Sequence, residues 1–419
     1  MLIGNTIGAG ILRTPGEVAA NLPSVPLFMS VWVAGAAYAL LGALTVAELA
    51  AMRPRSGGLY PLVHDAIGGY AGFVAGWTDW LAMSVASAAV AMVLGEYAGP
   101  LVPVLAGHAS LIGAVVVIAF LLVQWRGIRA GDLVQQITSL LKTVALLALA
   151  ALCLTLSDGP GTATTIAAPV PGGVALAGAV VVALQSAIVT YDGWTGPIYF
   201  GEELRHPERD IPRSMIGGVL LVLVIYLALN AAFLRVIPIR EMAGDPFVAA
   251  SAAARVFGQR GDLMLRLVMM VSLVAAVNAN LLMTSRVPFA MSRDGLLPAW
   301  LQRAARGTPV TALLTTAAFM LVCLATNTFD SLLAVVAFLY VANYALTFAG
   351  LFVSRRRAPL ARRPFRVPGY PFVPGLALTG SVAFMIASVL TDPRHSAVAV
   401  SLVALSWPVY RLAARTPKE

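Results

Sequence analysis

The sequence predicts an all-α polytopic membrane protein, and three observations support this fold class. Of its 419 residues, 59 % are apolar and only 11 % are charged, whereas soluble domains carry about 25 % charged residues. The mean hydropathy is +0.85. Apolar runs of about 17–25 residues recur along the chain, and each is long enough to cross a bilayer as a helix.

The apolar runs predict about twelve transmembrane helices in one transmembrane domain that covers residues 1–419. Short loops rich in glycine and proline separate them. The predicted spans occupy residues 1–22, 26–51, 69–97, 109–125, 132–156, 174–200, 214–238, 262–290, 309–327, 329–353, 371–390 and 396–413.

The positions of the basic residues predict the orientation. Counted from a cytoplasmic N-terminus, most of the 28 Lys and Arg residues fall in cytoplasmic loops or in the C-terminal tail. Cytoplasmic loops of membrane proteins are enriched in these residues. Both termini are therefore expected to be cytoplasmic. The net charge of +9 follows from this topology and does not indicate a nucleic-acid partner.

Two spans are interrupted in a similar way. The first contains "GNTIGAGILRTPG" at residues 4–16, and the sixth contains "TYDGWTGP" at residues 190–197. Glycine and proline at matching positions of two halves indicate discontinuous helices around a binding site. The halves would be inverted repeats at about 1–156 and 174–353, followed by additional helices at 371–413. The alternative is that the glycines only allow close helix packing.

Four motifs carry a resemblance to a known family. Besides "GNTIGAGILRTPG", these are "YDGWTGPIYFGEELRHPERDIPRSM" at 191–215, "TSRVPFAMSRDGLLPAWL" at 284–301 and "RRPFRVPGYPFVPGLAL" at 362–378. The chain resembles permeases of the amino acid–polyamine–organocation superfamily, and is similar to the L-type amino acid transporters and bacterial serine/threonine exchangers. The resemblance implies a leucine-transporter-type fold of 5+5 inverted repeats, in which helices 1 and 6 are broken. It also implies a transporter in the cell membrane. The sequence has no carboxylate pair with catalytic spacing and its four histidines have no metal-ligand spacing, so no enzyme activity, cofactor or metal is expected.

A broken helix can bind an amino acid zwitterion without charged side chains. Exposed N–H groups at the positive end of a half-helix accept a carboxylate, and unwound carbonyls accept an ammonium group. The resemblance implies that N–H groups come from Gly8, Ala9 and Gly10, and that Gly193 lets the sixth helix unwind. Carbonyls and part of the side-chain pocket would come from Ile7, Val189, Thr190 and Tyr191.

Two positions depart from the family pattern. Val189 stands where an aromatic residue often closes over the substrate, so the size of the substrate is open. Asp192 stands where some relatives carry glycine and others carry aspartate. Its carboxylate either caps the broken helix or faces the pocket. A carboxylate in the pocket would favour a cationic amino acid or a polyamine.

Lys142 is the only lysine inside a predicted span. Near a span end it would extend to the membrane surface, but it lies about ten residues into the fifth span. The resemblance implies that its ammonium group stands where sodium binds in sodium-coupled relatives, next to helix 1 near Gly8. Asn278 and Ser285 are candidate partners. The residue could also release and take up protons.

A loop of mixed charge follows the sixth span. Glu202, Glu203, Arg209 and Arg213 predict an inner gate of salt bridges, and the alternative is a solvated loop of little energetic weight. Three further carboxylates, Glu48, Asp79 and Glu96, lie near the ends of their spans and are interpreted as interfacial.

The sequence thus predicts a sodium-independent secondary transporter of amino acids, driven by exchange or by proton coupling. The alternatives are a proton-coupled antiporter of cationic amino acids or polyamines and a transport-dead sensor. The L-type transporters that the chain resembles attach to a single-span subunit through a cysteine in the loop after helix 3. The corresponding residues 98–108 contain no cysteine, and Cys153 and Cys323 lie within apolar runs. Besides substrate and lipid, no disulfide-linked subunit is therefore expected. The first break begins at Ile7, so we expect either a start codon further upstream or a missing first half of helix 1.

Overall fold

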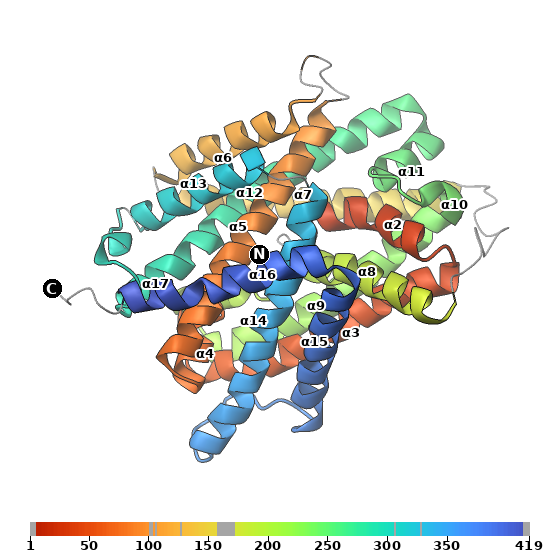
Figure 1. Ribbon diagram of the computed structural model, residues 1–419. Helices are drawn as coiled ribbons and strands as arrows, with labels where there is room; N and C mark the ends of the chain where they lie inside the picture. Colours follow the sequence, from red (N-terminus) through yellow and green to blue (C-terminus); the bar gives the residue numbers. More distant parts are fainter. Residues whose placement is uncertain are drawn as a thin grey trace.

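The chain folds into a bundle of helices (Figure 1). The computed structural model describes residues 6–99, 104, 107–125, 128–156, 172–305, 307–326 and 329–413. Within these ranges the only bridge between extended segments is an isolated one that joins Ala305 and Thr308. The helices are α2 (Ala9–Asn21), α3 (Val25–Met52), α4 (Tyr60–Ala66), α5 (Gly69–Ala98), α6 (Ala109–Trp125), α7 (Ile128–Leu156), α8 (Gly173–Tyr191), η2 (Gly196–Glu203), α9 (Pro207–Val236), α10 (Ile239–Met242), α11 (Val248–Phe257), α12 (Gln259–Arg293), η3 (Ala299–Gln302), α13 (Val310–Thr326), α14 (Phe329–Arg357), α15 (Phe372–Thr391), α16 (Pro393–Ala404) and α17 (Ser406–Ala413).

The helix lengths confirm a polytopic membrane fold. Among the described residues, eight helical segments are long and apolar enough to cross a bilayer. Three other predicted spans correspond to shorter apolar helices, namely α6, α13 and the described apolar part of α7. The count of twelve stays a prediction.

Three predicted spans differ from the helices that form. Residues 1–22 contain α2, which begins only at Ala9. Residues 174–200 are divided, because α8 ends at Tyr191 and η2 begins at Gly196. Residues 396–413 are shared between α16 and α17, which meet at Leu405. In the first two cases the helix is interrupted at glycine-rich sequence. Ordering a glycine in a helix costs more conformational entropy than ordering another residue, so the helical hydrogen bonds stop there.

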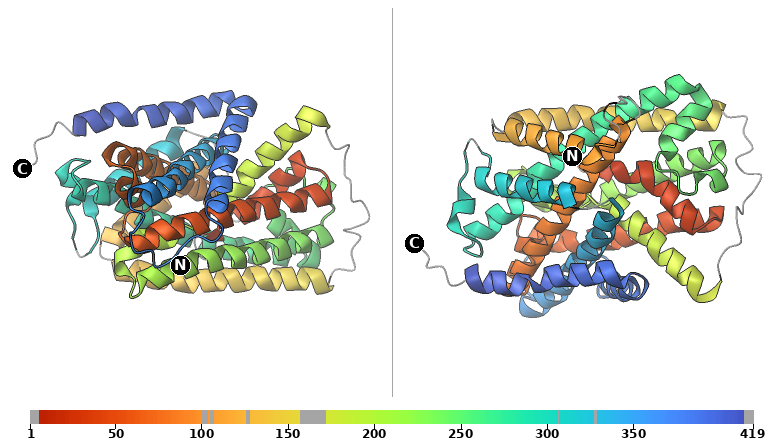
Figure 2. Two further views of the ribbon diagram at one scale, coloured as in Figure 1. Left: turned by 90° about the horizontal axis from the view of Figure 1, so that it is seen from below. Right: turned by 45° about the horizontal axis from the view of Figure 1, so that its top comes forward.

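Helix α5 forms the centre of the bundle. In its most apolar 18-residue window, 83 % of the residues are buried, and α5 packs against α12, α14 and α6. Helices α16 and α17 instead lie at the periphery in both views of Figure 2. Their window is only 17 % buried, so most of their apolar side chains are left to face lipid.

An aromatic cluster packs α3, α8 and α9 together. The Trp32 ring lies 6.2 Å from Tyr191 and 5.7 Å from Tyr226, both edge to face. All three side chains are almost fully buried. Such pairs stabilise packing by about 0.5–1.5 kcal/mol beyond the burial of their area. The cluster fixes α8, and with it the chain break that follows Tyr191.

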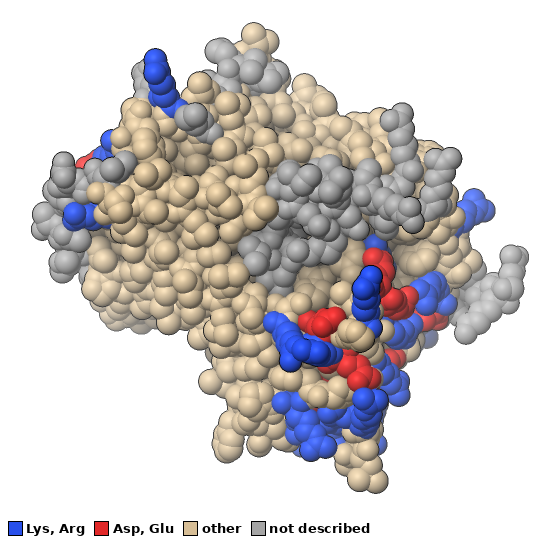
Figure 3. All heavy atoms as spheres, turned by 180° about the vertical axis from the view of Figure 1, so that it is seen from behind, with Lys and Arg blue, Asp and Glu red and all other residues tan. Residues whose placement is uncertain are grey.

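Charged side chains gather at one end of the molecule, which we call the basic end. In Figure 3 they lie at the bottom of the face shown, next to a broad area with few charges. We define the basic end by the arginines of three segments. These are Arg53 and Arg55 after α3, Arg293 at the end of α12, and, from the last turn of α14 to the start of α15, Arg355, Arg356, Arg357, Arg362, Arg363 and Arg366.

Candidate functional site

The first break lies directly before α2. Ile7 and Gly8 form a bend, and Gly8 takes the non-helical angles φ −134° and ψ −148° at the N-cap position. No side chain caps this helix end. The first N–H groups of a helix have no intrahelical partner. Within the described part of the chain, the N–H groups at the start of α2, from Ala9 and Gly10 onward, therefore have no side-chain cap that would compete with a ligand.

The second break separates α8 from η2. Asp192 is extended, with φ −60° and ψ 155°, and Gly193 has φ +109°. A positive φ of this size is accessible to glycine and strained for other residues. Gly193 therefore occupies the point at which the sixth helix unwinds, as the sequence predicts.

The two breaks touch each other through Gly10 and Thr190. A Cβ atom placed on Gly10 would lie 2.7 Å from Thr190 Oγ1 and 2.9 Å from Thr190 Cα. The hydroxyls of Thr14 and Thr190 share a hydrogen bond of 2.7 Å. Only glycine at position 10 allows α2 and α8 to approach this closely.

Tyr226 of α9 links the two breaks, and the sequence did not single it out. Its hydroxyl lies 2.8 Å from the carbonyl oxygen of Thr6 and 3.0 Å from that of Thr190 and donates to these acceptors. The side chain is fully buried. One hydroxyl thus links the backbone before the first break to the last turn of α8, which precedes the second break.

A cavity of about 90 Å³ lies between the breaks. It is large enough for several waters or a small ligand, since about 10–15 Å³ of such space holds one water. Five elements form its walls. The lining residues are Thr6, Gly8, Gly10 and Thr14 from the first break and α2, Val189, Thr190 and Asp192 from the second, Met83, Ala86, Ala89 and Val90 from α5, Asn280 from α12, and Val336 and Tyr340 from α14.

Asp192 is the charged residue of the cavity wall. Tyr344 donates a hydrogen bond to its carboxylate, and Tyr340 and the N–H of Gly193 also hydrogen-bond to it. The carboxylate therefore both binds backbone next to the break and faces the cavity. Its tyrosine partners come from successive turns of α14, which sequence patterns alone do not bring to the break.

The structure brings most of the predicted binding residues together. Gly8, Gly10, Val189, Thr190 and Asp192 line the cavity, and the backbone of Ala9 begins the adjoining helix. Ile7 and Tyr191 are buried next to these residues but do not line the cavity themselves. The Tyr191 ring packs against Trp32 and Tyr226, and a role for the Tyr191 carbonyl stays a prediction. Sequence reasoning missed Thr6, Thr14, Asn280 and Tyr340, whose only signal is a polar group within an apolar run.

Lys142 lies within α7 and is 1 % exposed. Its candidate partners Asn278 and Ser285 are also buried and lie on α12, which packs against α7. Gln124 of α6 donates to the backbone and side-chain oxygens of Asn278, at 2.9 and 2.8 Å. Ser285 donates to the carbonyl of Leu282 at 3.0 Å. A link from Lys142 to either residue stays a prediction.

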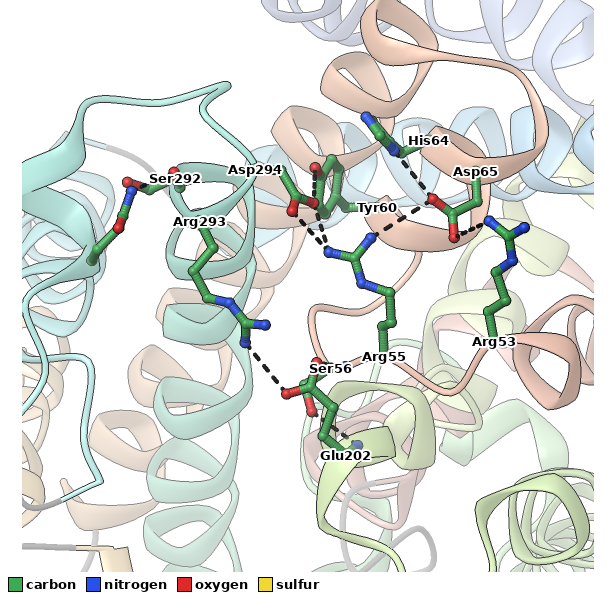
Figure 4. Close-up of polar contacts among 11 residues, drawn as sticks. Arg53, Arg55, Ser56, Tyr60, His64, Asp65, Glu202, Ser292, Arg293 and Asp294 are labelled. Carbon is green, nitrogen blue, oxygen red and sulfur yellow. Dashed lines mark hydrogen bonds and ion pairs between the residues drawn. The ribbon is translucent and has the colours of Figure 1, made fainter. Parts of the chain in front are cut away.

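A polar network at the basic end joins the α3–α4 loop and α4 to η2 and the end of α12 (Figure 4). Arg55 donates to both oxygens of Asp294, at 2.9 and 2.8 Å, and Tyr60 donates to the same carboxylate at 2.6 Å. Burial raises the pKa of Tyr60 and the bond to Asp294 adds to this effect, so the phenol remains a donor. The loop after α3 is thereby joined to the end of α12.

The same end of α12 holds η2. Glu202 forms an ion pair of 3.3 Å with Arg293 and accepts a hydrogen bond of 3.3 Å from the N–H of Ser56. Glu203 pairs with Arg286, whose guanidinium lies 4.1 Å from the centre of the Phe200 ring. The half-helix after the second break is thus fixed to α12 and to the α3–α4 loop.

This network corrects part of the predicted inner gate. Glu202 and Glu203 do form ion pairs, but their partners are the α12 residues Arg293 and Arg286. Arg209 and Arg213 form no ion pair within the described part of the chain and are exposed on the first turns of α9. Charge patterning within one loop could not reveal partners that come from a distant helix.

Two carboxylates interpreted as interfacial are in fact buried. Asp79 of α5 is 2 % exposed and accepts two bonds of 2.9 Å from the Tyr199 hydroxyl of η2. Glu48 of α3 is fully buried and binds Arg355 and Arg363. Burying a carboxylate is costly unless it is paired and hydrogen-bonded, and tertiary partners meet that condition. Glu96 remains partly exposed and pairs with Arg13 of α2.

Comparison with known proteins gives a match over almost the whole chain. The sequence profile of the family described as amino acid permease matches residues 1–410. The serine/threonine exchanger SteT of Bacillus subtilis is 29 % identical over 98 % of this chain and 94 % of its own length. The b(0,+)-type amino acid transporter 1 of Mus musculus is 27 % identical over 98 % and 85 % of the two chains. The large neutral amino acids transporter small subunit 2 of Homo sapiens is 30 % identical over 98 % and 78 %.

Proposed function

Because the chain belongs to the amino acid permease family, we propose that it is a sodium-independent secondary transporter that moves amino acids by alternating access. The observation that carries this proposal is the cavity between the two breaks, lined by Gly8 and Gly10 on one side and Thr190 and Asp192 on the other. The family and the relatives are transporters, not enzymes.

The substrate is bound largely by backbone. Its carboxylate accepts hydrogen bonds from the uncapped N–H groups at the start of α2, where the helix dipole is positive. Its ammonium group lies toward the second break, near the carbonyl of Val189 and the carboxylate of Asp192. The small residues Ala86 and Ala89 of α5 face the side chain. Free α-amino acids share the zwitterion that this arrangement recognises.

Lys142 supplies the fixed cation that replaces sodium. Its burial in α7, a helix that packs against α12, supports this role. A buried ammonium group must be compensated by polar partners, and the carbonyls of a broken helix are suitable ones. Transport would then depend on exchange or on protons, and not on a sodium gradient.

The 5+5 inverted repeat supplies the moving parts. The broken helices α2 and α8–η2 rock against a scaffold that contains α5, α12 and α14, and the ion pairs of η2 with α12 form the inner gate. The basic end is cytoplasmic, as are both termini, because Lys and Arg concentrate in cytoplasmic loops. The protein works in the cell membrane without a disulfide-linked subunit, since Cys153 and Cys323 are both buried within helices.

A second candidate function is the proton-coupled antiport of cationic amino acids or polyamines. The specific observation in its favour is that Asp192 lines the cavity, where it could pair with a second positive charge. Asp192→Asn removes that charge and keeps the shape. If the substrate is cationic, this variant loses uptake of lysine or putrescine and keeps uptake of neutral amino acids.

Uptake by purified protein in proteoliposomes tests both candidates. A panel of labelled amino acids and polyamines is offered with and without internal amino acid, and with imposed sodium or pH gradients. We expect uptake that is stimulated by internal amino acid or by a pH gradient and is unchanged by sodium. Folded protein that transports none of these compounds would contradict the proposal, as would uptake that requires sodium.

A further inference from the structure

A hollow at the basic end has no part in the site described above. It has a volume of about 590 Å³ and lies between the first turns of α9 and the connection from α14 to α15. Its walls include Arg209, Pro212, Arg213, Ile216, Pro364 and Phe365. One end of the hollow is therefore basic, and the rest is mainly apolar.

The basic part carries two positive charges that form no ion pair within the described part of the chain. Arg209 and Arg213 stand one helical turn apart, so their side chains share one face of α9. Both are exposed, and neither has an acidic partner in the described ranges. Glu208 also lines the hollow, but Arg362 pairs with its carboxylate at 2.9 Å. The pair at 209 and 213 is left to attract an anion.

The apolar part continues along α9 in the direction of the membrane. Beyond Ile216, the side chains of Leu220, Leu221 and Val224 are 45 %, 44 % and 63 % exposed. A Cβ atom added at Gly217 would meet no heavy atom within 4 Å. The hollow therefore opens onto an exposed apolar strip of the helix, which has room for a hydrocarbon chain.

The length of α9 places the two arginines at the level of lipid headgroups. Its 30 residues span about 45 Å at about 1.5 Å per residue, whereas the hydrocarbon core of a bilayer is about 30 Å thick. The first turns, which carry Arg209 and Arg213, precede the apolar run that begins at Ile216. In a bilayer that covers this apolar run, they would lie outside the hydrocarbon core, at the level of the phosphates.

We propose that this hollow binds one anionic phospholipid. Its phosphate accepts hydrogen bonds from Arg209 and Arg213, whose planar guanidinium groups suit phosphate geometry. One acyl chain lies past Gly217 along the exposed strip of α9. A basic pocket beside transmembrane helices combines headgroup attraction with burial of apolar surface. Since η2 joins α9 through only three residues, 204–206, the bound lipid also steadies the segment next to the inner gate.

Binding can be measured on the full chain without any transport assay. The protein is placed in mild detergent, and its Tm and its lipid adducts in native mass spectrometry are followed during titration with phosphatidylglycerol or with phosphatidylcholine of the same acyl chains. We expect phosphatidylglycerol to raise Tm and to bind at least tenfold more tightly than phosphatidylcholine. In Arg209→Gln/Arg213→Gln this preference is lost.

Matched variants distinguish binding in the hollow from general attraction of an anionic lipid to the basic end. Arg356→Gln/Arg366→Gln removes two exposed arginines of the same end outside the hollow, and should keep the preference. Gly217→Leu fills the apolar part without a change of charge, and should weaken binding of phosphatidylglycerol severalfold. Equal loss in both double-arginine variants would overturn the proposal, as would equal binding of the two lipids. Full competition by millimolar inorganic phosphate would identify a free anion as the ligand instead.

Discussion

At the scale of single residues, the site depends on close contacts between the two breaks. Gly10 lets α2 approach Thr190 closely, and the Tyr226 hydroxyl donates to the carbonyls of Thr6 and Thr190. None of these interactions involves a full charge. Their geometry is consequently sensitive to the addition or removal of one or two atoms.

Tyr226→Phe should impair transport and lower stability. The change removes a buried hydroxyl and leaves the carbonyls of Thr6 and Thr190 without this donor, which costs about 1–3 kcal/mol. We expect a rise in KM for amino acid uptake together with a lower Tm. Tyr38→Phe is the control, because the Tyr38 hydroxyl shares its hydrogen bond with Ser381 of α15 and not with a carbonyl of either break. If both variants transport equally well, Tyr226 does not set the geometry of the site.

Gly10→Ala should abolish uptake. The added methyl group would lie 2.7 Å from Thr190 Oγ1 and 2.9 Å from its Cα, so α2 must move away from α8. Overpacking of this kind costs about 1–3 kcal/mol. Gly380→Ala in α15 introduces the same atom where nothing lies within 4 Å, and should retain wild-type rates. Uptake and Tm are measured for both, and normal uptake by the position 10 variant would refute the close contact.

At the scale of elements, the short half-helix η2 is held from several sides. Arg286 and Arg293 of α12, Ser56 of the α3–α4 loop and Asp79 of α5 all bind it. A 3-10 helix of eight residues has little stability of its own. Its position is determined by these partners, which makes them candidates for the contacts that break and reform during transport.

The Glu203–Arg286 pair should contribute measurably to closure of the basic end. Arg286 has a side chain only 9 % exposed, and it also lies over Phe200. A double-mutant cycle with Glu203→Gln and Arg286→Gln should give a coupling free energy of about 1 kcal/mol for the opening of the basic end. The readout is the labelling rate of a cysteine introduced at Ala86 in the cavity.

The exposed pair Glu208–Arg362 provides the comparison for that cycle. Its side chains are 43 % and 82 % exposed, and such surface pairs contribute about 0–1 kcal/mol. We expect a coupling close to zero and no change in the labelling rate. A coupling at Glu203–Arg286 no larger than this would remove the pair from the gate.

At the scale of the whole molecule, buried polar residues join parts of the chain that are far apart in sequence. Glu48 of α3 binds Arg355 and Arg363 and accepts a bond of 2.7 Å from the N–H of Val367. The turn between α14 and α15 is thereby fixed to α3. Lys142 occupies a comparable buried position in α7.

Glu48→Gln should lower the stability of the whole protein. Removal of one partner leaves two arginines in a buried setting, and breaking a buried pair costs about 3–5 kcal/mol. We expect a clear fall in Tm. Glu208→Gln, which breaks an exposed pair at the same end, should change Tm little. A Tm equal to the wild type in Glu48→Gln would mean that the carboxylate is not what holds the turn.

Lys142→Ala should abolish transport or make it insensitive to an imposed pH gradient. The variant removes the cation that we propose in place of sodium. Leu141→Ala changes the neighbouring residue, which is 49 % exposed, and should leave uptake unchanged. Uptake with and without sodium and pH gradients is compared for both. Normal rates and normal pH dependence in Lys142→Ala would exclude this role.

The sequence by itself determined the class, the two breaks and most of the residues around them. Apolar runs, basic loops and glycines are local features, and each acts through its own segment of chain: a run crosses the bilayer, and Gly193 unwinds its own helix. The resemblance of these two segments to the family's broken helices then implied Gly8, Gly10, Val189 and Thr190 as site residues, with Asp192 next to them.

Only the tertiary structure decided which side chains meet. Tyr226, Tyr340 and Tyr344 come to the breaks from α9 and α14, and Arg286 and Arg293 come to η2 from α12. In each case the partners are separated by many residues and carry no shared pattern. Packing also turned Tyr191 away from the cavity and buried Asp79 and Glu48. The physical reason is that apolar burial fixes the helices first, and buried polar groups must then be satisfied by whatever partner the packed helices bring within reach.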